Sequence, residues 1–277
     1  MRRAVQDEEA ARQRERERIL QVLATPALLV PHYQPILELG SRAVVGYEAL
    51  ARFRSEPLQP PNVWFAQAAE VGLGAELQAL AVHRARGVAR QAHLPAGAFL
   101  SLNVSPRYLA SAPVAAALDG GALDRLVIEV TEDEAVADYA ALRAAMTPYL
   151  ARGARVAVDD AGAGYASMRH VTELRPDFVK LDAQLIRGLG DDTARQALVS
   201  ALVGFTATIG ATPIAEGVEE PADLALLART RQPLLVQGYA IARPGPAWPA
   251  VEPAVLGTAL PRRQVGQPHL EPGTATS

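Results

Sequence analysis

The sequence predicts an α/β protein of the closed (β/α)8, TIM-type barrel class, on three observations. Short apolar stretches alternate along the chain with longer amphipathic stretches rich in alanine and leucine. Eight such apolar stretches occur, and no linker-like composition separates them. The length of 277 residues also fits a single barrel of this class. An open, doubly wound sheet is the alternative, but no G-x-G-x-x-G loop follows the first predicted strand to support it.

The predicted strands and helices follow one another in chain order. Each strand is a short apolar run, and we expect strands at residues 32–37, 43–53, 98–104, 125–130, 155–158, 178–181, 212–215 and 234–237. Apolar residues recur at helical spacing between them, which predicts helices that include 76–91, 134–151, 192–210 and 221–229.

The two ends of the chain differ from the barrel. Residues 1–23 predict an exposed helix, because charges of both signs are densely mixed there and large apolar residues cluster only from Ile19 onward. A short coiled coil or a partner-binding helix is the alternative for this segment. Residues 262–277 predict a disordered tail, because proline is frequent and large apolar side chains are few. The barrel is therefore expected over residues 24–261.

Composition excludes several classes of function. The chain has no cysteine, which rules out disulfides, thiolate metal sites and cysteine nucleophiles. Its net charge of −3 gives no basic surplus for binding a DNA or RNA polymer. The apolar runs are too short to span a membrane, and the N-terminus has no signal-peptide core. We therefore expect a cytoplasmic protein.

Polar side chains stand at the ends of nearly all the predicted strands, where the active sites of such barrels lie. They are Glu48, Asn103, Glu129, Asp159, Asp160, Lys180, Glu216 and Gln237. Any one alone could be a helix cap or a surface residue. Together they would converge in one cup, where crowded carboxylates need cations to offset their repulsion. Oxygen ligands favour magnesium, manganese or calcium over zinc.

The adjacent pair Asp159 and Asp160 sharpens this expectation. A carboxylate at a strand end can bridge two cations while its neighbour holds one of them, which is an arrangement used on phosphodiesters. Lys180, on the next strand, could offset negative charge in the reaction. The alternative for adjacent aspartates is an Asx turn.

Nine short motifs between residues 24 and 246 carry a family resemblance. They are YQPI (33–36), GYEALARFR (46–54), FAQAAEVGL (65–73), LNVSP (102–106), IEVTE (128–132), DDAGAGYAS (159–167), VKLD (179–182), AEGVEE (215–220) and QGYAIARP (237–244). In this order they resemble the EAL domain family, the cyclic di-GMP phosphodiesterases of bacteria. The resemblance implies a modified barrel with one antiparallel strand near its start. It further implies hydrolysis of cyclic di-GMP to linear pGpG, two Mg²⁺ or Mn²⁺ ions, and a homodimer.

The resemblance also implies roles for individual residues. Glu48, Asn103, Glu129 and Asp159 would hold one metal ion, and Asp159, Asp160 and Glu216 the other. Lys180 would contact the attacking water, with Glu216 as the candidate general base. The positions that match substrate-binding residues are Gln34, Leu50, Arg52, Glu219 and Tyr239. Gln237 would support the metal–water network, and Glu132 would anchor the loop after the fifth strand.

The chain departs from the family in one loop, where DDAGAGYAS stands in place of the usual DDFGTGYSS. Loss of the phenylalanine at Ala161 predicts a loosely packed loop that binds the second metal weakly. The alternative is that neighbouring side chains fill the space. Because the metal-ligand positions are intact, an enzyme is the expected function. The alternatives are a non-catalytic cyclic di-GMP receptor and an adaptor that binds neither nucleotide nor metal.

Overall fold

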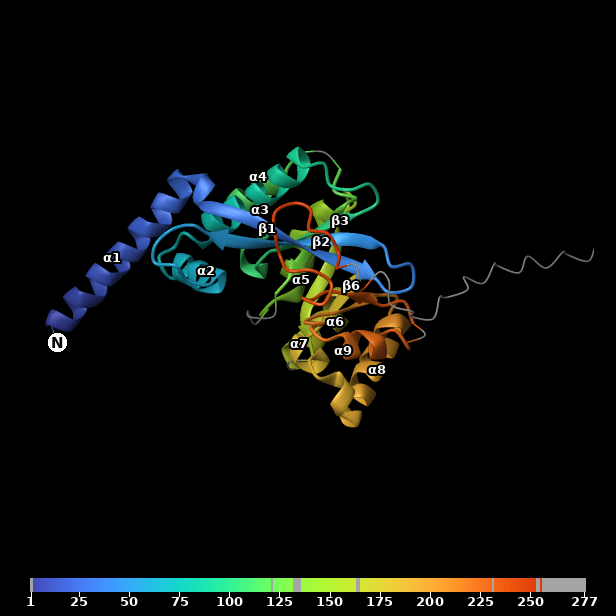
Figure 1. Ribbon diagram of the computed structural model, residues 1–277. Coiled ribbons are helices and arrows are strands. Elements are labelled where there is room, and N and C mark those ends of the chain that lie inside the picture. Colours follow the sequence, from blue (N-terminus) through green and yellow to red (C-terminus); the bar gives the residue numbers. More distant parts are fainter. Residues whose placement is uncertain are drawn as a thin grey trace, which may run out of the picture.

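Eight strands close into a single barrel in chain order, as predicted (Figure 1). The computed structural model describes residues 2–120, 122–131, 136–162, 165–230, 232–252 and 255. The strands are β1 (Leu29–Glu38), β2 (Val44–Phe53), β3 (Phe99–Asn103), β4 (Leu126–Val130), β5 (Arg155–Ala161), β6 (Phe178–Leu181), β7 (Thr212–Ala215) and β8 (Leu235–Val236). β1 runs antiparallel to both β2 and β8, and the remaining neighbours are parallel. The modified barrel with one antiparallel strand near its start is therefore confirmed.

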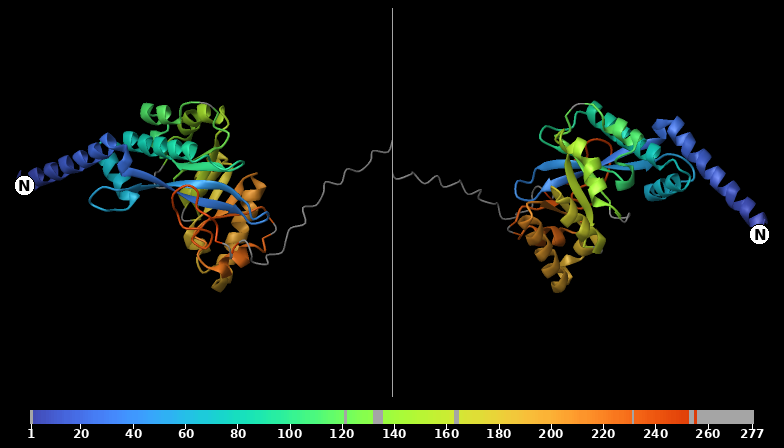
Figure 2. Two further views of the ribbon diagram at one scale, coloured as in Figure 1. Left: turned by 45° about the horizontal axis from the view of Figure 1, so that its top comes forward. Right: turned by 180° about the vertical axis from the view of Figure 1, so that it is seen from behind.

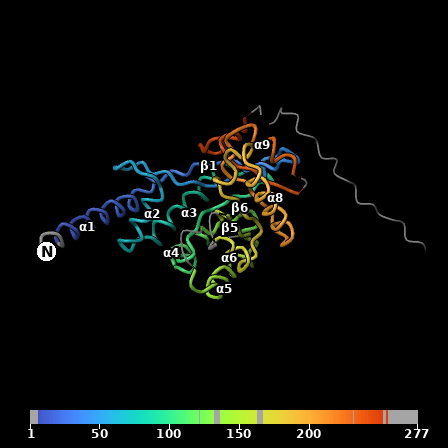
Figure 3. The backbone as a smooth tube through the Cα atoms, turned by 90° about the horizontal axis from the view of Figure 1, so that it is seen from below, coloured from blue at the N-terminus to red at the C-terminus, as the bar shows by residue number. Residues whose placement is uncertain are grey.

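Helices connect the parallel strands and cover the outside of the barrel. They are α2 (Pro61–Glu70), α3 (Gly74–Gln91), α4 (Ala112–Leu118), α5 (Tyr139–Leu150), α6 (Tyr165–Leu174), α7 (Ala183–Ile186), α8 (Thr193–Thr208) and α9 (Pro221–Leu227), with 3-10 turns at Pro26–Leu28, Pro106–Tyr108 and Leu189–Asp191. Figure 3 shows α2 and α3 on one side and α8 and α9 on the other. Within the described ranges, no helix is long and apolar enough to cross a membrane.

One predicted helix begins later than expected. The range 134–151 becomes α5, which starts at Tyr139, and residues 136–138 are not helical. The cause is Asp138, whose side chain accepts hydrogen bonds from the backbone N–H groups of Ala140 and Ala141 and so caps the helix. Residues 134 and 135 lie outside the described residues, as do residue Glu132 and the tail predicted for 262–277.

The N-terminal helix α1 (Arg2–Ala24) projects from the barrel (Figures 1 and 2). Its last turns are attached by Ile19 and Val22, which are buried in a cluster with Phe53 and Trp64. The two rings stack with their centroids 4.9 Å apart. The helix matches the one predicted for residues 1–23, whereas the division of the chain at residues 23 and 261 stays a prediction.

Apolar side chains from seven strands fill the interior near the start of the parallel strands. The cluster consists of Ile36, Phe99, Val127, Ala157, Phe178, Ile214 and Leu235. The guanidinium of Arg155 lies 5.0 Å from the ring centroids of both Phe99 and Phe178. Because side chains close this end of the barrel, a polar site can open only at the other end, where the parallel strands finish.

Candidate active site

Four carboxylates surround one lysine at the open end of the barrel. The Lys180 ammonium Nζ lies 2.8 Å from Glu216 Oε1, 3.2 Å from Asp159 Oδ1 and 3.6 Å from Glu48 Oε2. It also donates a hydrogen bond to Glu129. These five side chains, which we call the Lys180 cluster, come from β2, β4, β5, β6 and the residue after β7. Lys180 is only 2% exposed, so the cluster excludes most bulk water.

Burial and mutual repulsion shift the titration of these groups. Burial raises the pKa of Glu129 well above its usual range, and the neighbouring carboxylates add to the rise against the opposing charge of Lys180. The pKa of Glu216 is raised for the same reasons. At Asp159 burial is outweighed by Lys180 and by hydrogen bonds, so its pKa falls below the usual value. Burial disfavours the charged form of Lys180, but the carboxylates outweigh burial and raise its pKa. The single charge of Lys180 therefore does not offset the burial and repulsion of all four carboxylates.

Neutral side chains hold two of the carboxylates in place. Asn103 Nδ2 donates to Glu48 Oε1 over 2.8 Å, and Gln237 Nε2 donates to Glu48 Oε2. Ser101 Oγ donates to Glu129 Oε2 over 2.8 Å. Ser101 is not among the site residues predicted from the sequence. It precedes Asn103 by two residues in β3, so strand alternation puts both side chains on one face.

Asp160 completes a set of three carboxylates that could hold a cation. One oxygen from each of Asp159, Asp160 and Glu216 lies within 4.8 Å of the other two. Asp160 has φ +52°, a left-handed conformation that is uncommon outside glycine and concentrates at functional sites. Two observations fit divalent cations here: a single lysine stands among four carboxylates, and the buried Gln237 Oε1 has no hydrogen-bond partner among the residues that the structure describes. The donor set is all oxygen, as Mg²⁺ and Mn²⁺ prefer.

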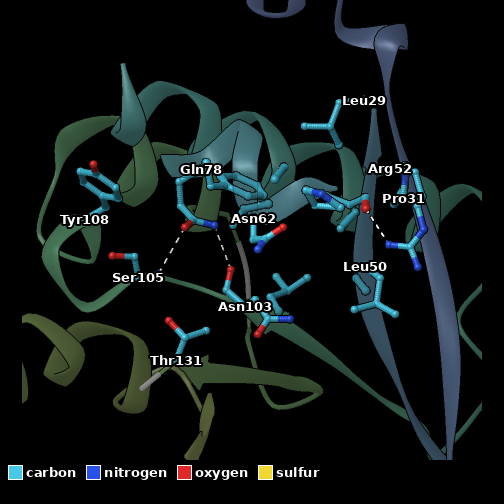
Figure 4. A pocket seen from close by; sticks show the side chains of 18 of the residues that line it. Leu29, Pro31, Leu50, Arg52, Asn62, Gln78, Asn103, Ser105, Tyr108 and Thr131 are labelled. Carbon is cyan, nitrogen blue, oxygen red and sulfur yellow. Dashed lines mark hydrogen bonds between the residues drawn. The ribbon is translucent and has the colours of Figure 1, made fainter. Parts of the chain in front are cut away.

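The residues matched to substrate binding lie in three places. Leu50 and Arg52 line a cavity of about 580 Å³ that also reaches Asn103 (Figure 4). Gln34 is buried, where it accepts from Gln237 Nε2 over 3.0 Å and donates to the Ala242 carbonyl. Glu219 lies beyond the end of β7 and Tyr239 beyond the end of β8, and neither lines this cavity.

Those two residues have charged neighbours. Glu219 Oε1 lies 2.8 Å from Arg187 Nη2. Tyr239 is 47% exposed, and the guanidinium carbon of Arg243 lies 4.3 Å from its ring centroid. Glu132, matched to the loop anchor, lies outside the described residues.

Comparison with known proteins identifies the family of the chain, because the EAL domain family matches residues 17–244, most of the chain. The chain belongs to the EAL domain family. MucR of Pseudomonas aeruginosa, a bifunctional diguanylate cyclase/cyclic di-GMP phosphodiesterase, is 30% identical over 232 residues, 79% of this chain. The chain spans about a third of that relative's length (33%).

Solved structures of EAL proteins share the fold of this chain. The PaMucR phosphodiesterase, solved in complex with c-di-GMP, has a TM-score of 0.70 at 28% identity, over 82% of this chain and 96% of that one. BlrP1 of Klebsiella pneumoniae, solved with manganese and c-di-GMP, has a TM-score of 0.68 at 29% identity, over 79% of this chain and 56% of that one.

The loop that differs from the family pattern begins with two closely surrounded residues, Ala161 and Gly162. Ala161 is completely buried in the core and pairs with Leu181 in the sheet. Gly162 has φ +105°, and a side chain there would collide with Leu185. The core thus encloses Ala161, and Leu185 occupies the space beside Gly162, which favours the second of the two alternatives for this segment.

Ala161→Phe is therefore expected to overpack the site and destabilise this EAL domain by about 1–3 kcal/mol. Asp160 is the adjacent residue, so a displaced backbone should also raise the Mn²⁺ concentration needed for half-maximal binding. Urea unfolding and an Mn²⁺ titration of both proteins measure the two effects. A lower Mn²⁺ requirement in the variant would instead support the loosely packed loop.

Proposed function

We propose that the chain hydrolyses cyclic di-GMP to linear pGpG with two divalent cations, Mg²⁺ or Mn²⁺. The observation that carries the proposal is the Lys180 cluster itself, a lysine among four carboxylates at the open end of an EAL barrel. Asp160 adds a further carboxylate, one of whose oxygens lies within 4.8 Å of oxygens of Asp159 and Glu216. MucR, which shares 30% of the matched residues, is named as a cyclic di-GMP phosphodiesterase.

The proposed metal ligands form two sets that share Asp159. Glu48, Asn103, Glu129 and Asp159 would hold one cation, and Asp159, Asp160 and Glu216 the other. Bound cations would supply positive charge that lowers the pKa of a bound water and offsets the negative charge of the phosphate. They would also oppose the burial and the carboxylate repulsion that raise the pKa values of Glu129 and Glu216.

The protein's own groups carry the proton and orient the attack. Lys180 holds the attacking water and offsets the negative charge that builds on the phosphate oxygens. Glu216, 2.8 Å from Lys180, accepts the proton of that water. The water oxygen forms a new bond to phosphorus, the bond from phosphorus to the 3′ oxygen breaks, and the 3′ oxygen takes up a proton. One ring opening per molecule gives pGpG.

The substrate would span the open end of the barrel. Leu50 contacts one half of the dinucleotide in the cavity beside Asn103, and the planar fork of Arg52 binds phosphate or a guanine edge. Glu219 and Tyr239 bind the other half. Gln34 contributes to substrate binding. Gln237 would order water next to the cations through its Oε1, which has no hydrogen-bond partner within the described part of the chain. The homodimer, the cytoplasmic location and the anchoring role of Glu132 stay predictions.

A turnover assay tests the proposal. Purified chain is incubated with cyclic di-GMP in Mn²⁺, and a parallel sample contains EDTA. Formation of pGpG only with Mn²⁺ supports the enzyme. Tight nucleotide binding without pGpG would instead identify a receptor, and neither binding nor turnover would identify an adaptor.

Mn²⁺ alone is expected to stabilise the folded chain. Because the ligand set exists only in the folded state, Mn²⁺ at 100 times its dissociation constant should add about 2.7 kcal/mol per site. Thermal unfolding with and without Mn²⁺ measures the gain. Asp160→Ala should reduce the gain, and a wild-type melting temperature that Mn²⁺ does not change would contradict the metal site.

A further inference from the structure

Gln78, on the outer helix α3, contacts the backbone at the end of β3 (Figure 4). Its side-chain amide donates from Nε2 to the Asn103 carbonyl over 2.9 Å. Its Oε1 accepts from the Ser105 backbone N–H over 3.3 Å. Gln78 is 7% exposed, so these contacts are made largely away from bulk water. The amide therefore clamps the backbone on both sides of Val104.

This clamp lies where the chain leaves the barrel wall. Asn103 is the last residue of β3, and the following N–H, that of Val104, donates to the backbone carbonyl of Glu129 in β4. Beyond this point, the sheet ladder no longer constrains the backbone. Gln78 provides hydrogen-bond partners for the Asn103 carbonyl and the Ser105 N–H. Either group would destabilise the fold if it were buried without a partner. Gln78 thus supplies the hydrogen bonds that a neighbouring strand would make to the residues just after β3.

The clamped residue carries a side chain of the proposed metal site. Asn103 Nδ2 donates to Glu48 Oε1 over 2.8 Å, so the direction of the Asn103 side chain is coupled to the position of Glu48. Gln78 has no charge and contacts the backbone of Asn103, so it can act on a cation only through the orientation of its ligands. Residues that orient metal ligands from outside commonly affect affinity by about 10–100-fold.

We propose that Gln78 is a positioning residue, which fixes the end of β3 so that Asn103 and Glu48 face the same cation. The inference rests on the proposed function, because it concerns the cation held by Glu48 and Asn103. Gln78 also lines the cavity beside Leu50 and Arg52, so the same clamp sets the wall of the substrate pocket.

Gln78→Met tests the inference, because methionine has nearly the volume of glutamine but cannot make either hydrogen bond. Gln91→Met is the matched control, since Gln91 is an exposed glutamine at the end of the same helix. Mn²⁺ binding is measured by calorimetry on the full chain without nucleotide. We expect Gln78→Met to weaken Mn²⁺ binding by about 10–100-fold, and Gln91→Met to leave it unchanged. The rate at saturating Mn²⁺ should recover much of the wild-type value.

The outcomes separate this inference from the proposed function. Unchanged Mn²⁺ affinity in a folded Gln78→Met chain would overturn the positioning role, even if the protein unfolds at a lower temperature, and would leave the phosphodiesterase standing. A wild-type chain that binds no Mn²⁺ would overturn both. Should Gln78→Met fail to fold, Gln78→Asn keeps the amide but is one methylene too short to reach both backbone groups. The same loss of Mn²⁺ affinity is expected of it, and unchanged affinity would overturn the inference.

Discussion

Asp159→Ala is expected to abolish hydrolysis of cyclic di-GMP while the barrel stays folded. Asp159 lies at the end of β5, 3.2 Å from Lys180, and belongs to both proposed ligand sets. Its removal takes an oxygen ligand from each cation, whereas no apolar packing is lost. Product formation is measured by chromatography of pGpG. Glu48→Ala should have the same effect, because it removes a ligand and the partner of both Asn103 and Gln237.

The control for charge and folding is Asp191→Ala, because Asp191 is an exposed aspartate in the 3-10 turn Leu189–Asp191 and belongs to neither proposed ligand set. It should keep wild-type turnover, and all three variants should keep the wild-type circular dichroism spectrum. Near-normal turnover by Asp159→Ala or Glu48→Ala would refute the assignment of the two ligand sets.

Lys180→Met is expected to lower the maximal rate by about 10²–10³-fold with little change in substrate affinity, because charge acting mainly in the transition state raises the rate more than it tightens binding. Methionine fills much of the space of the buried lysine, so packing is largely kept. The carboxylates lose their internal cation, and we therefore compare folding with Mn²⁺ present. The kcat and KM for cyclic di-GMP are measured separately.

The opposite pattern would assign Lys180 a different role. If KM rose steeply while kcat stayed high, Lys180 would be a substrate-binding residue and the transition-state role would be wrong. Arg52→Met is a useful comparison, since Arg52 lines the cavity outside the Lys180 cluster and should raise KM more than it lowers kcat.

Much of the fold follows from the alternation of apolar runs along the chain. The predicted ranges 178–181 and 212–215 coincide with β6 and β7, whose side chains are almost all buried. The prediction falls short at β1, which begins at Leu29 because it pairs with β2 as far as Phe53. A strand with two prolines does not show its length in its own pattern, because partner pairing decides it.

The charged residues of the candidate site could be predicted from the sequence, but the residues that hydrogen-bond or pair with the site residues could not. Glu48, Asp159 and Lys180 are recognisable because ionisable residues are rare at buried strand ends. Gln78 gives no such signal, because a glutamine in a charged helix has many possible neighbours. The pairing of Glu219 with Arg187 likewise depends on how the loops after β6 and β7 meet. Such contacts join residues distant in sequence, which single-residue patterns do not encode.

The most direct measurement is the product formed from cyclic di-GMP by the purified chain and Mn²⁺ in ¹⁸O-labelled water. We expect pGpG to accumulate with one ¹⁸O atom in its 5′-phosphate, since water attacks phosphorus and the 3′ oxygen leaves. EDTA should prevent the reaction. Unchanged cyclic di-GMP would contradict the phosphodiesterase activity, and pGpG whose phosphate lacks the label would contradict attack of water at phosphorus.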